Sequence, residues 1–312
     1  MQLPLVSVVI LSFNRRDDLQ VTLQKVYEMD YQNFEVIVVD NNSTDGSAEI
    51  VKNNFSSVCL ISLQKNIGIA GWNEGFKIAK GEFVLVLDDD SYPEKDAVKK
   101  GVDVMLKNEL CGVAAFSVWN ENRKFFETKD YHETKILTTF IGCGALIRTV
   151  IFSLAGMFSE ILFLYEHEVE FSMRVIDKGY SIFFCQEAQI IHIASPKNRI
   201  LVKNIIDKRR QFYICRNILL ILFMHFLLRN IWWRVIRIII GRLYFGLKYH
   251  CFISSVKGIT EALILLITKK IEKKILSPLA QVIYNYGHYY NAFFFEESGY
   301  SNKKPRWIKR FI

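Results

Sequence analysis

Four apolar segments alternate with helical ones in residues 1–90, and this alternation constrains the fold more than any other feature of the sequence. The apolar segments read LVSVVILSF, FEVIVVD, VCLISL and EFVLVLDDD. The stretch after the first of them has Leu19, Leu23 and Val26 at helical spacing. Strands that are apolar on both faces and alternate with helices are typical of a mostly parallel sheet flanked by helices. We therefore predict an α/β fold.

Polar side chains stand where the predicted strands end. Ser12 and Asn14 follow the first strand, Asp40 ends the second, and the acidic triplet 88–90 ends the fourth. In open parallel sheets, ligands bind beyond the carboxyl ends of the strands. We therefore expect these strand ends to form one ligand-binding rim.

The three consecutive aspartates, residues 88–90, need a compensating positive charge. Crowded carboxylates raise one another's pKa, and an unpaired buried charge is costly. A solvated turn or helix cap is the simpler interpretation, but three Asp directly after a nearly uninterrupted apolar run are unusual in a simple turn. Mg²⁺ and Mn²⁺ take oxygen ligands and share them with substrate phosphates. The triplet therefore predicts a divalent cation that bridges to a diphosphate.

Weaker signals indicate a nucleotide. Asp40 can accept hydrogen bonds from a base or ribose, and the loop NIGIAGWNEG offers Gly71 for close backbone approach beside Asn66 and Asn73. The sequence has no Walker motif, and this loop is no dinucleotide fingerprint because it does not follow the first strand. Trp72 in the same loop is expected either to stack on a sugar or base or to pack in the core.

Taken together, these segments resemble a known family. VSVVILSFNR, VIVVDNNSTDGS and NIGIAGWNEGFKIAKGEFVLVLDDDSYP are similar to the nucleotide-sugar half of family 2 glycosyltransferases, inverting enzymes of the GT-A fold, over residues 5–96. GCGALIR, FLYEHEVEFSMRVIDKGY and AQIIH resemble the acceptor half of the rhamnosyltransferase-like branch and extend the match to about residue 217. The resemblance implies the GT-A nucleotide-diphospho-sugar transferase fold, with Mn²⁺ or Mg²⁺ as cofactor.

The resemblance also assigns roles by position. It implies that Asp40 reads the nucleotide base, that Asp88 and Asp90 are the outer acids of a DXD motif, and that Asp89 lies on the ribose side. His192 closes the apolar run AQIIH, where a lone His is more often structural, but the family frequently places a His there near the metal or diphosphate. The expected donor-binding residues are Ser12, Asn14, Asp40, Asn66, Gly71, Asn73, Asp88 and Asp89, and the expected metal ligands are Asp88, Asp90 and His192.

The resemblance places the catalytic base at the start of a helix. The family usually has a Glu-Asp pair there, whereas this chain has His167-Glu168, so Glu168 takes the position of the base. A carboxylate at this point can remove the proton of an acceptor hydroxyl during an inverting transfer. Spacing alone fits equally well a solvated helix face formed by Glu166, Glu168 and Glu170. Arg174 is expected to be a structural partner of Glu170, four residues earlier.

Charge divides the chain. Residues 1–195 hold 18 Lys and Arg against 27 Asp and Glu, whereas residues 196–312 hold 22 against 5. Such a division points to different partners for the two parts. In the second part, basic residues interleave with aromatic and aliphatic ones, as in Trp232-Trp233-Arg234 and in KKIEKK at 269–274. Helices of this composition favour an anionic membrane surface, and the alternatives are a cap on the catalytic domain or a homo-oligomer surface.

We predict a GT-A catalytic domain over residues 1–215, with a nucleotide-sugar half at 1–96 and an acceptor half at 97–215. A C-terminal amphipathic helical region is predicted over 216–312. Its longest charge-free apolar run, at 218–228, is too short to cross a bilayer. The six scattered cysteines lack disulfide or zinc spacing, and the N-terminus lacks signal-peptide features. We therefore expect a cytoplasmic chain, peripheral on the inner face of the membrane.

The expected function is that of a metal-dependent inverting glycosyltransferase of the hexosyltransferase type. It would move a sugar from a nucleoside-diphosphate sugar to a hydroxyl of a lipid-linked or growing surface polysaccharide, and no nucleic-acid motif is visible. One alternative is a non-catalytic nucleotide-sugar-binding or membrane scaffold protein, against which the acids at 88, 90 and 168 argue. A nucleotidyltransferase is the other, and only Arg15 and Arg16 in SFNRRDD support it.

Overall fold

The computed structural model describes residues 3–129, 136–194, 208–269 and 271–281. The strands are β1 (Val6–Ser12), β2 (Phe34–Asp40), β3 (Cys59–Ser62), β4 (Phe83–Asp88), β5 (Ser91–Pro93), β6 (Cys111–Asn120), β7 (Phe125–Phe126), β8 (Ile136–Leu137), β9 (Ala145–Arg148) and β10 (Ser181–His192). The α-helices are α1 (Arg16–Tyr27), α2 (Ser47–Asn54), α3 (Gly71–Ile78), α4 (Ala97–Lys107), α5 (Val150–Leu154), α6 (His167–Asp177), α7 (Lys208–His225), α8 (Leu228–Lys248) and α9 (Phe252–Thr268). Two short 3₁₀ turns are η1 (Gly68–Ala70) and η3 (Glu160–Leu162).

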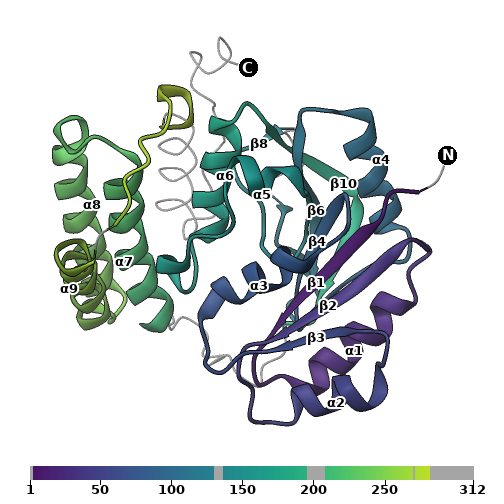
Figure 1. Ribbon diagram of the computed structural model, residues 1–312. Coiled ribbons are helices and arrows are strands. Elements are labelled where there is room, and N and C mark those ends of the chain that lie inside the picture. The colour runs from purple at the N-terminus through teal and green to yellow at the C-terminus, as the bar shows by residue number, and fades with distance from the viewer. Residues whose placement is uncertain (1–2, 130–135, 195–207, 270, 282–312) are drawn as a thin grey trace.

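One ten-stranded sheet forms the centre of the fold, in the order β3-β2-β1-β4-β9-β6-β10-β5, with β7 beside β6 and β8 beside β10 (Figure 1). Strands β3, β2, β1 and β4 pair in parallel, as the alternation of strands and helices predicts. Strand β9 then enters antiparallel to both β4 and β6, so the sheet as a whole is mixed. The register sets Ser12 opposite Asp40, and Leu11 opposite Asp88. The predicted polar strand ends therefore meet at one edge of the sheet.

Successive residues of the strands feed two separate cores. Val8 and Ile10 of β1 belong to the core that also contains residues of α1, α2 and α4, whereas Val9 belongs to the core with residues of α3, α5 and α6. Trp72 packs in the second core, and its indole N–H donates to the Leu87 carbonyl at 3.1 Å. Each large apolar side chain buried in this way contributes about 1.5–3 kcal/mol. Of the two expectations for Trp72, the structure therefore favours core packing.

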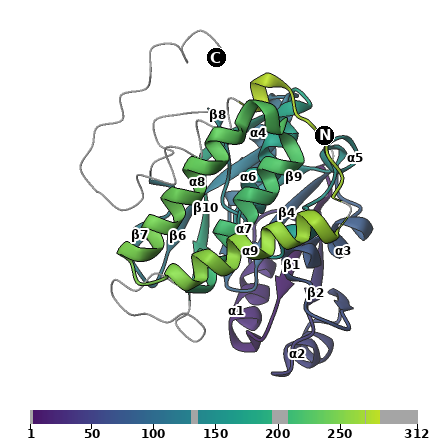
Figure 2. The same cartoon turned by 90° about the vertical axis from the view of Figure 1, so that its left-hand side faces the viewer.

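The C-terminal helices form a third apolar cluster that includes Leu162 and Met173 of the sheet domain. Figure 1 shows α7, α8 and α9 gathered on one side of the sheet, beyond α3 and α6, and Figure 2 looks directly onto them. The domain boundary predicted at 215/216 falls inside α7, a continuous helix from Lys208 that packs against the loop before α6 as well as against α8 and α9. No helix in the described part of the chain is long and apolar enough to span a membrane.

Candidate active site

The acidic triplet lies in the turn that joins β4 to β5. The Ser91 hydroxyl oxygen accepts the backbone N–H of Asp88 at 2.9 Å, and the Thr22 hydroxyl donates to the Asp89 carbonyl at 2.8 Å. Strand β5 is antiparallel to β10, and their register places Ser91 opposite His192. This pairing carries His192 to the acidic turn, about a hundred residues from it in the sequence.

The three predicted metal ligands lie together. Asp88, Asp90 and His192 each offer one ligand atom, and these atoms are within 4.8 Å of one another. The His192 Nε2 atom is 3.5 Å from Asp90 Oδ1, and Nδ1 is 2.8 Å from Glu127 Oε1, a hydrogen bond that orients the ring. Burial would lower the pKa of His192, but hydrogen bonds with Asp90 and Glu127 outweigh it and raise the pKa to about 9. Two carboxylates and one imidazole fit a divalent cation such as Mn²⁺ or Mg²⁺.

Arg15 already compensates part of the acidic charge. Its Nη1 atom is 2.7 Å from Asp90 Oδ2 and 3.2 Å from Asp18 Oδ2, and its Nε atom is 3.7 Å from Asp89 Oδ1. Burial alone would lower the pKa of Arg15, but the charges of Asp90 and Asp89 outweigh it, so the guanidinium stays charged. This role of Arg15 was not predicted from the sequence. The usable signal is an Arg shortly after the end of one predicted strand and three acids at the end of another, since both strand ends were expected at one rim.

Asp89 is held by the chain itself. Its carboxylate accepts the backbone N–H of Phe13 at 2.9 Å and lies beside Arg15. Burial and the neighbouring charge of Asp90 raise the pKa of Asp89 well above its usual range. The structure thus gives Asp89 a structural role at the β1 end, and its predicted contact with ribose stays a prediction.

Ser12 and Asp40 are two of the predicted donor-binding residues, and the fold brings them together. They are opposite each other at the ends of β1 and β2, and both are buried. Asp40 Oδ2 accepts the N–H of Ser43 at 3.2 Å, whereas Asp40 Oδ1 and Ser12 Oγ have no hydrogen-bond partner among the described residues. A buried polar atom without a partner costs about 1–3 kcal/mol, which a ligand that bonds it recovers. Asn14 lies next to them, with a left-handed φ of 54°.

Side-chain amides of Asn41 and Asn66 hold the start of the glycine loop, residues 66–75, in place. Asn66 Oδ1 accepts the Asn41 side-chain amide at 3.1 Å and the Gly68 N–H at 2.8 Å, and Asn41 also donates to the Gly68 carbonyl. Gly71 packs closely on β1, because a Cβ there would lie 2.4 Å from Leu11 Cδ1 and the Leu11 side chain would have to move. Contacts of Asn66 and Gly71 with a donor remain predictions.

Asn73, a predicted donor-binding residue, has a structural role that the fold shows clearly. It is buried, its Nδ2 atom donates to the Phe158 carbonyl at 2.9 Å, and its Oδ1 atom accepts the Phe158 N–H at 3.0 Å. This pair of bonds ties α3 to the segment before η3. A donor contact by Asn73 would have to share these atoms.

Glu168 lies in the first turn of α6 with a partly accessible side chain, 23% exposed. Burial raises the pKa of Glu168 to about 7, against the opposing effect of a hydrogen bond with the Gly142 backbone. A Cβ on Gly142 would lie 2.9 Å from Glu168 Oε1, so the Gly142 backbone passes close to this carboxylate. Burial raises the pKa of the neighbouring Cys143 thiol, and the charges of Asp88, Glu127, Asp90 and Glu168 raise it further. Both Glu168 and the acidic cluster thus act electrostatically on the residue that follows Gly142.

The neighbours of Glu168 have other roles. His167 is buried and stacked on Trp72 at 5.7 Å, and burial lowers its pKa to about 3, so the imidazole is neutral. Arg174 pairs with Glu170 through contacts of 2.8 and 2.7 Å, which confirms the predicted i, i+4 partnership. Glu170 is thereby fixed in the interior.

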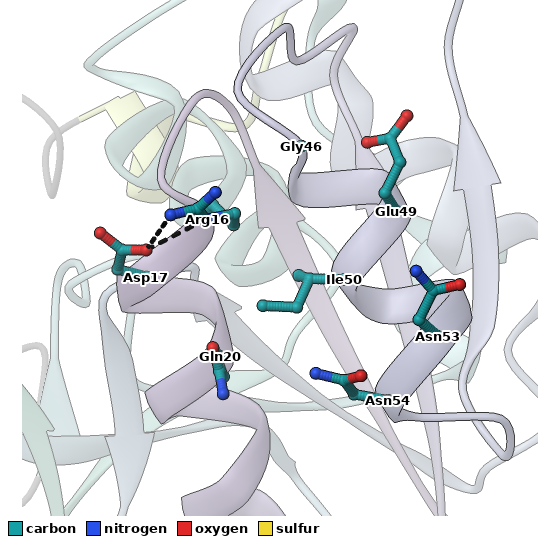
Figure 3. A pocket seen from close by; sticks show the side chains of 8 residues that line it. All are labelled: Arg16, Asp17, Gln20, Gly46, Glu49, Ile50, Asn53 and Asn54. Carbon is teal, nitrogen blue, oxygen red and sulfur yellow. Dashed lines mark hydrogen bonds and ion pairs between the residues drawn. The ribbon is translucent and has the colours of Figure 1, made fainter.

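A separate hollow of about 380 Å³ lies between α1 and α2 (Figure 3). Polar side chains dominate its lining, and Arg16 there is paired with Asp17 at 3.0 Å. The lining consists of Arg16, Asp17, Gln20, Gly46, Glu49, Ile50, Asn53 and Asn54. It shares no residue with the predicted site, and we therefore place the candidate site at the strand ends.

Comparison with known proteins gives one family and several relatives. A family model described as "Glycosyl transferase family 2" matches residues 7–167. A Methanococcus voltae protein, "Dolichyl N-acetyl-alpha-D-glucosaminyl phosphate 3-beta-D-2,3-diacetamido-2,3-dideoxy-beta-D-glucuronosyltransferase", is 25% identical over 206 residues, which are 57% of this chain and 63% of that protein. An Escherichia coli protein, "UDP-Glc:alpha-D-GlcNAc-diphosphoundecaprenol beta-1,3-glucosyltransferase WfaP", is 26% identical over 189 residues, 56% of this chain and 71% of that one.

Among solved structures, the mannosyltransferase PcManGT from Pyrobaculum calidifontis, in complex with GDP-Man and Mn²⁺, is similar with a TM-score of 0.56. The identity is 14%, and the match covers 93% of this chain and 81% of that one, so the likeness concerns the GT-A fold alone. The chain spans less than two thirds of the length of the first curated relatives it matches. Because the family model covers more than half of its residues, the chain belongs to glycosyl transferase family 2.

Proposed function

We propose that the chain is a metal-dependent inverting glycosyltransferase that moves a sugar from a nucleoside-diphosphate sugar to a hydroxyl of a lipid-linked glycan. The observation that supports this most strongly is the set of possible metal ligands at the strand ends, Asp88, Asp90 and His192. A second observation concerns Glu168, a partly accessible carboxylate with a pKa raised to about 7, whose charge acts with those of Asp88 and Asp90 on the Cys143 thiol.

On the donor side, the unpartnered atoms of Ser12 and Asp40 suit a nucleoside. Asp88, Asp90 and His192 would hold Mn²⁺ or Mg²⁺, and the bound ion would supply charge stabilisation for the diphosphate as it leaves. The fold relative PcManGT is described with GDP-Man and Mn²⁺, which is in keeping with this assignment. The rhamnosyltransferase-like assignment from the sequence stays a prediction.

On the acceptor side, Glu168 would act as general base. Its carboxylate takes the proton of the acceptor hydroxyl as that oxygen forms a bond to the anomeric carbon. The bond from the anomeric carbon to the diphosphate oxygen breaks on the opposite face, and the nucleoside diphosphate leaves with the electron pair. A base is most effective when its pKa lies near the working pH, and burial raises the pKa of Glu168 to about 7.

The acceptor is proposed to be lipid-linked, because the two relatives are described as acting on dolichyl phosphate and diphosphoundecaprenol glycans. Helix α8 supports a membrane-facing role at the cytoplasmic surface. It carries five Arg or Lys and no acid, and an exposed apolar stripe at three- and four-residue spacing. The stripe consists of Trp233, Ile236, Ile240, Tyr244 and Leu247, with exposed fractions of 41 to 67%. A second copy of the chain is the competing occupant of this face.

The alternatives lose support at particular residues. Arg15, on which a nucleotidyltransferase relied, is engaged by Asp90 and Asp18, and Arg16 is paired with Asp17. A non-catalytic scaffold would have no use for a set of metal ligands together with a carboxylate whose pKa is raised to about 7.

The replacement Glu168→Gln tests the proposal. With a labelled nucleoside-diphosphate sugar and a polyprenyl-diphosphate-linked sugar as acceptor, we expect kcat to fall by about 10²–10⁴. Calorimetry in the presence of Mn²⁺ should give an unchanged donor Kd, because the base does not hold the donor. The exposed Glu160→Gln, from the same segment, is the matched control and should transfer normally. Normal turnover by Glu168→Gln would refute the assignment of the base.

A further inference from the structure

The loop that leads into α6 has an unusual backbone. Phe163, Tyr165 and Glu166 all adopt positive φ angles, of 54°, 63° and 65°. Non-glycine residues rarely take such angles, and they persist only where the surroundings enforce them. Glu168 follows this loop by two residues. The position of its carboxylate therefore depends on what holds residues 161–166 in place.

Helix α7 supplies the main restraint on this loop. The side-chain amide of Asn217, which is fully buried, lies within hydrogen-bond distance of three loop carbonyls. Its Nδ2 atom is 2.8 Å from Leu162 O, 2.7 Å from Leu164 O and 2.9 Å from Tyr165 O. The three acceptors share the two hydrogens of one amide. Asn217 thus provides hydrogen bonds for loop carbonyls that have no partner in a helix or sheet.

Arg216 orients this amide and adds contacts of its own. Its Nη1 atom donates to Asn217 Oδ1 at 2.7 Å, and its Nη2 atom donates to Ile161 O at 2.8 Å. On its other side, Arg216 Nε donates to Glu261 of α9 at 2.8 Å. The pair therefore connects the loop to two of the C-terminal helices.

The opposite side of the loop rests on the glycine loop of the donor half. The N–H of Ile69 donates to Phe163 O at 2.8 Å. A Cβ on Gly68 would lie 2.0 Å from the same oxygen, so the two loops are in direct backbone contact. The loop before α6 is thus braced between the donor half and α7.

A second contact fixes α6 itself to α7. His225, at the end of α7, places Nε2 2.8 Å from Glu170 Oε1, and both side chains are buried. Asn217 and His225 therefore hold α7 to the chain on either side of Glu168, at Tyr165 and at Glu170. A shift of α7 relative to the sheet would move the carboxylate with it.

We propose that Asn217, oriented by Arg216, is a positioning residue that sets the place of Glu168. The inference rests on the proposed role of Glu168 as the base. It makes the C-terminal helices part of the catalytic apparatus in addition to any role as an attachment surface. A displacement of the order of 1 Å in a reacting group can lower a rate about 10²-fold, so a brace of this kind has a measurable effect.

The test compares Asn217→Ala with wild type in the transfer assay. We expect kcat to fall by about 10- to 100-fold while the donor KM stays within about twofold, because the donor half keeps its own contacts. We also expect the acid limb of the pH profile to move to lower pH, because the released Glu168 becomes better solvated. A loss of stability alone would move neither readout.

Gln211→Ala is the matched control. Gln211 is a buried amide on the same helix, but it donates to Ser255 Oγ of α9 at 2.9 Å and does not contact the loop. The Gln211→Ala variant should have a lower melting temperature than wild type, with kcat and the pH profile unchanged. If Asn217→Ala does not fold, Arg216→Lys takes its place, because it keeps a cation beside Glu261 and loses the reach to Ile161 O.

Each result has a distinct meaning. One result would overturn this inference alone. In it, Glu168→Gln is inactive, whereas the folded Asn217→Ala variant, or Arg216→Lys in its place, keeps the wild-type kcat and pH profile. Normal turnover by Glu168→Gln would overturn the proposed base and this inference together. An equal loss of kcat in Gln211→Ala would show that α7 acts only through general stability, which also contradicts the proposal.

Discussion

Glu170 forms a buried ion pair with Arg174 of the same helix and contacts His225 of α7, and its removal should be costly. The Glu170 side chain is 1% exposed and accepts hydrogen bonds from Arg174 Nε and Nη2 at 2.8 and 2.7 Å. His225 Nε2 is 2.8 Å from the same carboxylate. The replacement Glu170→Ala leaves the Arg174 guanidinium buried without its carboxylate partner. We expect a large loss of stability.

Two routes give the magnitude. Breaking a buried ion pair by removing one partner costs about 3–5 kcal/mol. Burial alone would raise the pKa of Glu170, but the Arg174 charge and the His225 hydrogen bond outweigh it and lower the pKa from 4.5 to about 2. At about 1.4 kcal/mol per pKa unit, the lowered pKa corresponds to roughly 3 kcal/mol. For a chain of 312 residues, with an unfolding entropy of about 2.1 cal/mol/K per residue, that is a fall in Tm of roughly 5 °C.

The sign of the pH dependence follows from the lowered pKa of Glu170. Its stabilisation is fully present above pH 4.5, the ordinary value, and is lost as the pH falls towards about 2. Thermal and urea unfolding of wild type and Glu170→Ala should therefore differ most at neutral pH and converge in acid. Glu160→Ala, an exposed replacement, is the control. A difference below about 1 kcal/mol at neutral pH, or one that does not shrink in acid, would refute the reasoning.

Three further outcomes are expected. Transfer should rise with pH through about 7, because burial raises the pKa of Glu168 to about 7 and the base acts deprotonated; a profile flat across neutral pH would contradict this. Gly75→Ala should cost about 1–3 kcal/mol, because its Cβ would lie 2.4 Å from Val9 Cγ1, and an unchanged urea midpoint would count against it. Trp233→Ala with Ile240→Ala should weaken flotation with phosphatidylglycerol vesicles; unchanged flotation, or dissociation of a dimer instead, would argue against a membrane-facing α8.

The sequence was sufficient for features that depend on local pattern. The apolar runs of β1, β2 and β4 and the polar residues that end them follow from strand periodicity, and parallel pairing brings Ser12 and Asp40 together. His192 was predicted only through a family resemblance. Its neighbour Glu127 was not predicted, because the bond between them joins residues 65 apart in the sequence.

The contacts of α7 illustrate what local pattern does not encode. In the sequence, Asn217 is one of several polar residues of α7, yet in the fold it bonds carbonyls more than fifty residues away. The boundary predicted at 215/216 followed a change in composition, and the structure shows that this position lies inside α7, in a region that packs against Leu162 and Met173. From the sequence, Arg15 was taken as support for a nucleotidyltransferase, whereas in the fold it pairs with Asp90.

The most direct test of the account is a thermal-shift panel of nucleoside-diphosphate sugars with and without Mn²⁺, on wild type and Asp90→Asn. A donor at about 100 times its Kd should stabilise wild type by about 2.7 kcal/mol, several degrees in Tm. We predict that at least one donor gives this shift only with Mn²⁺, that Asp90→Asn abolishes it, and that Glu168→Gln retains it. No shift with any donor, or the same shift in Asp90→Asn, would contradict a metal-assisted donor site at the strand ends.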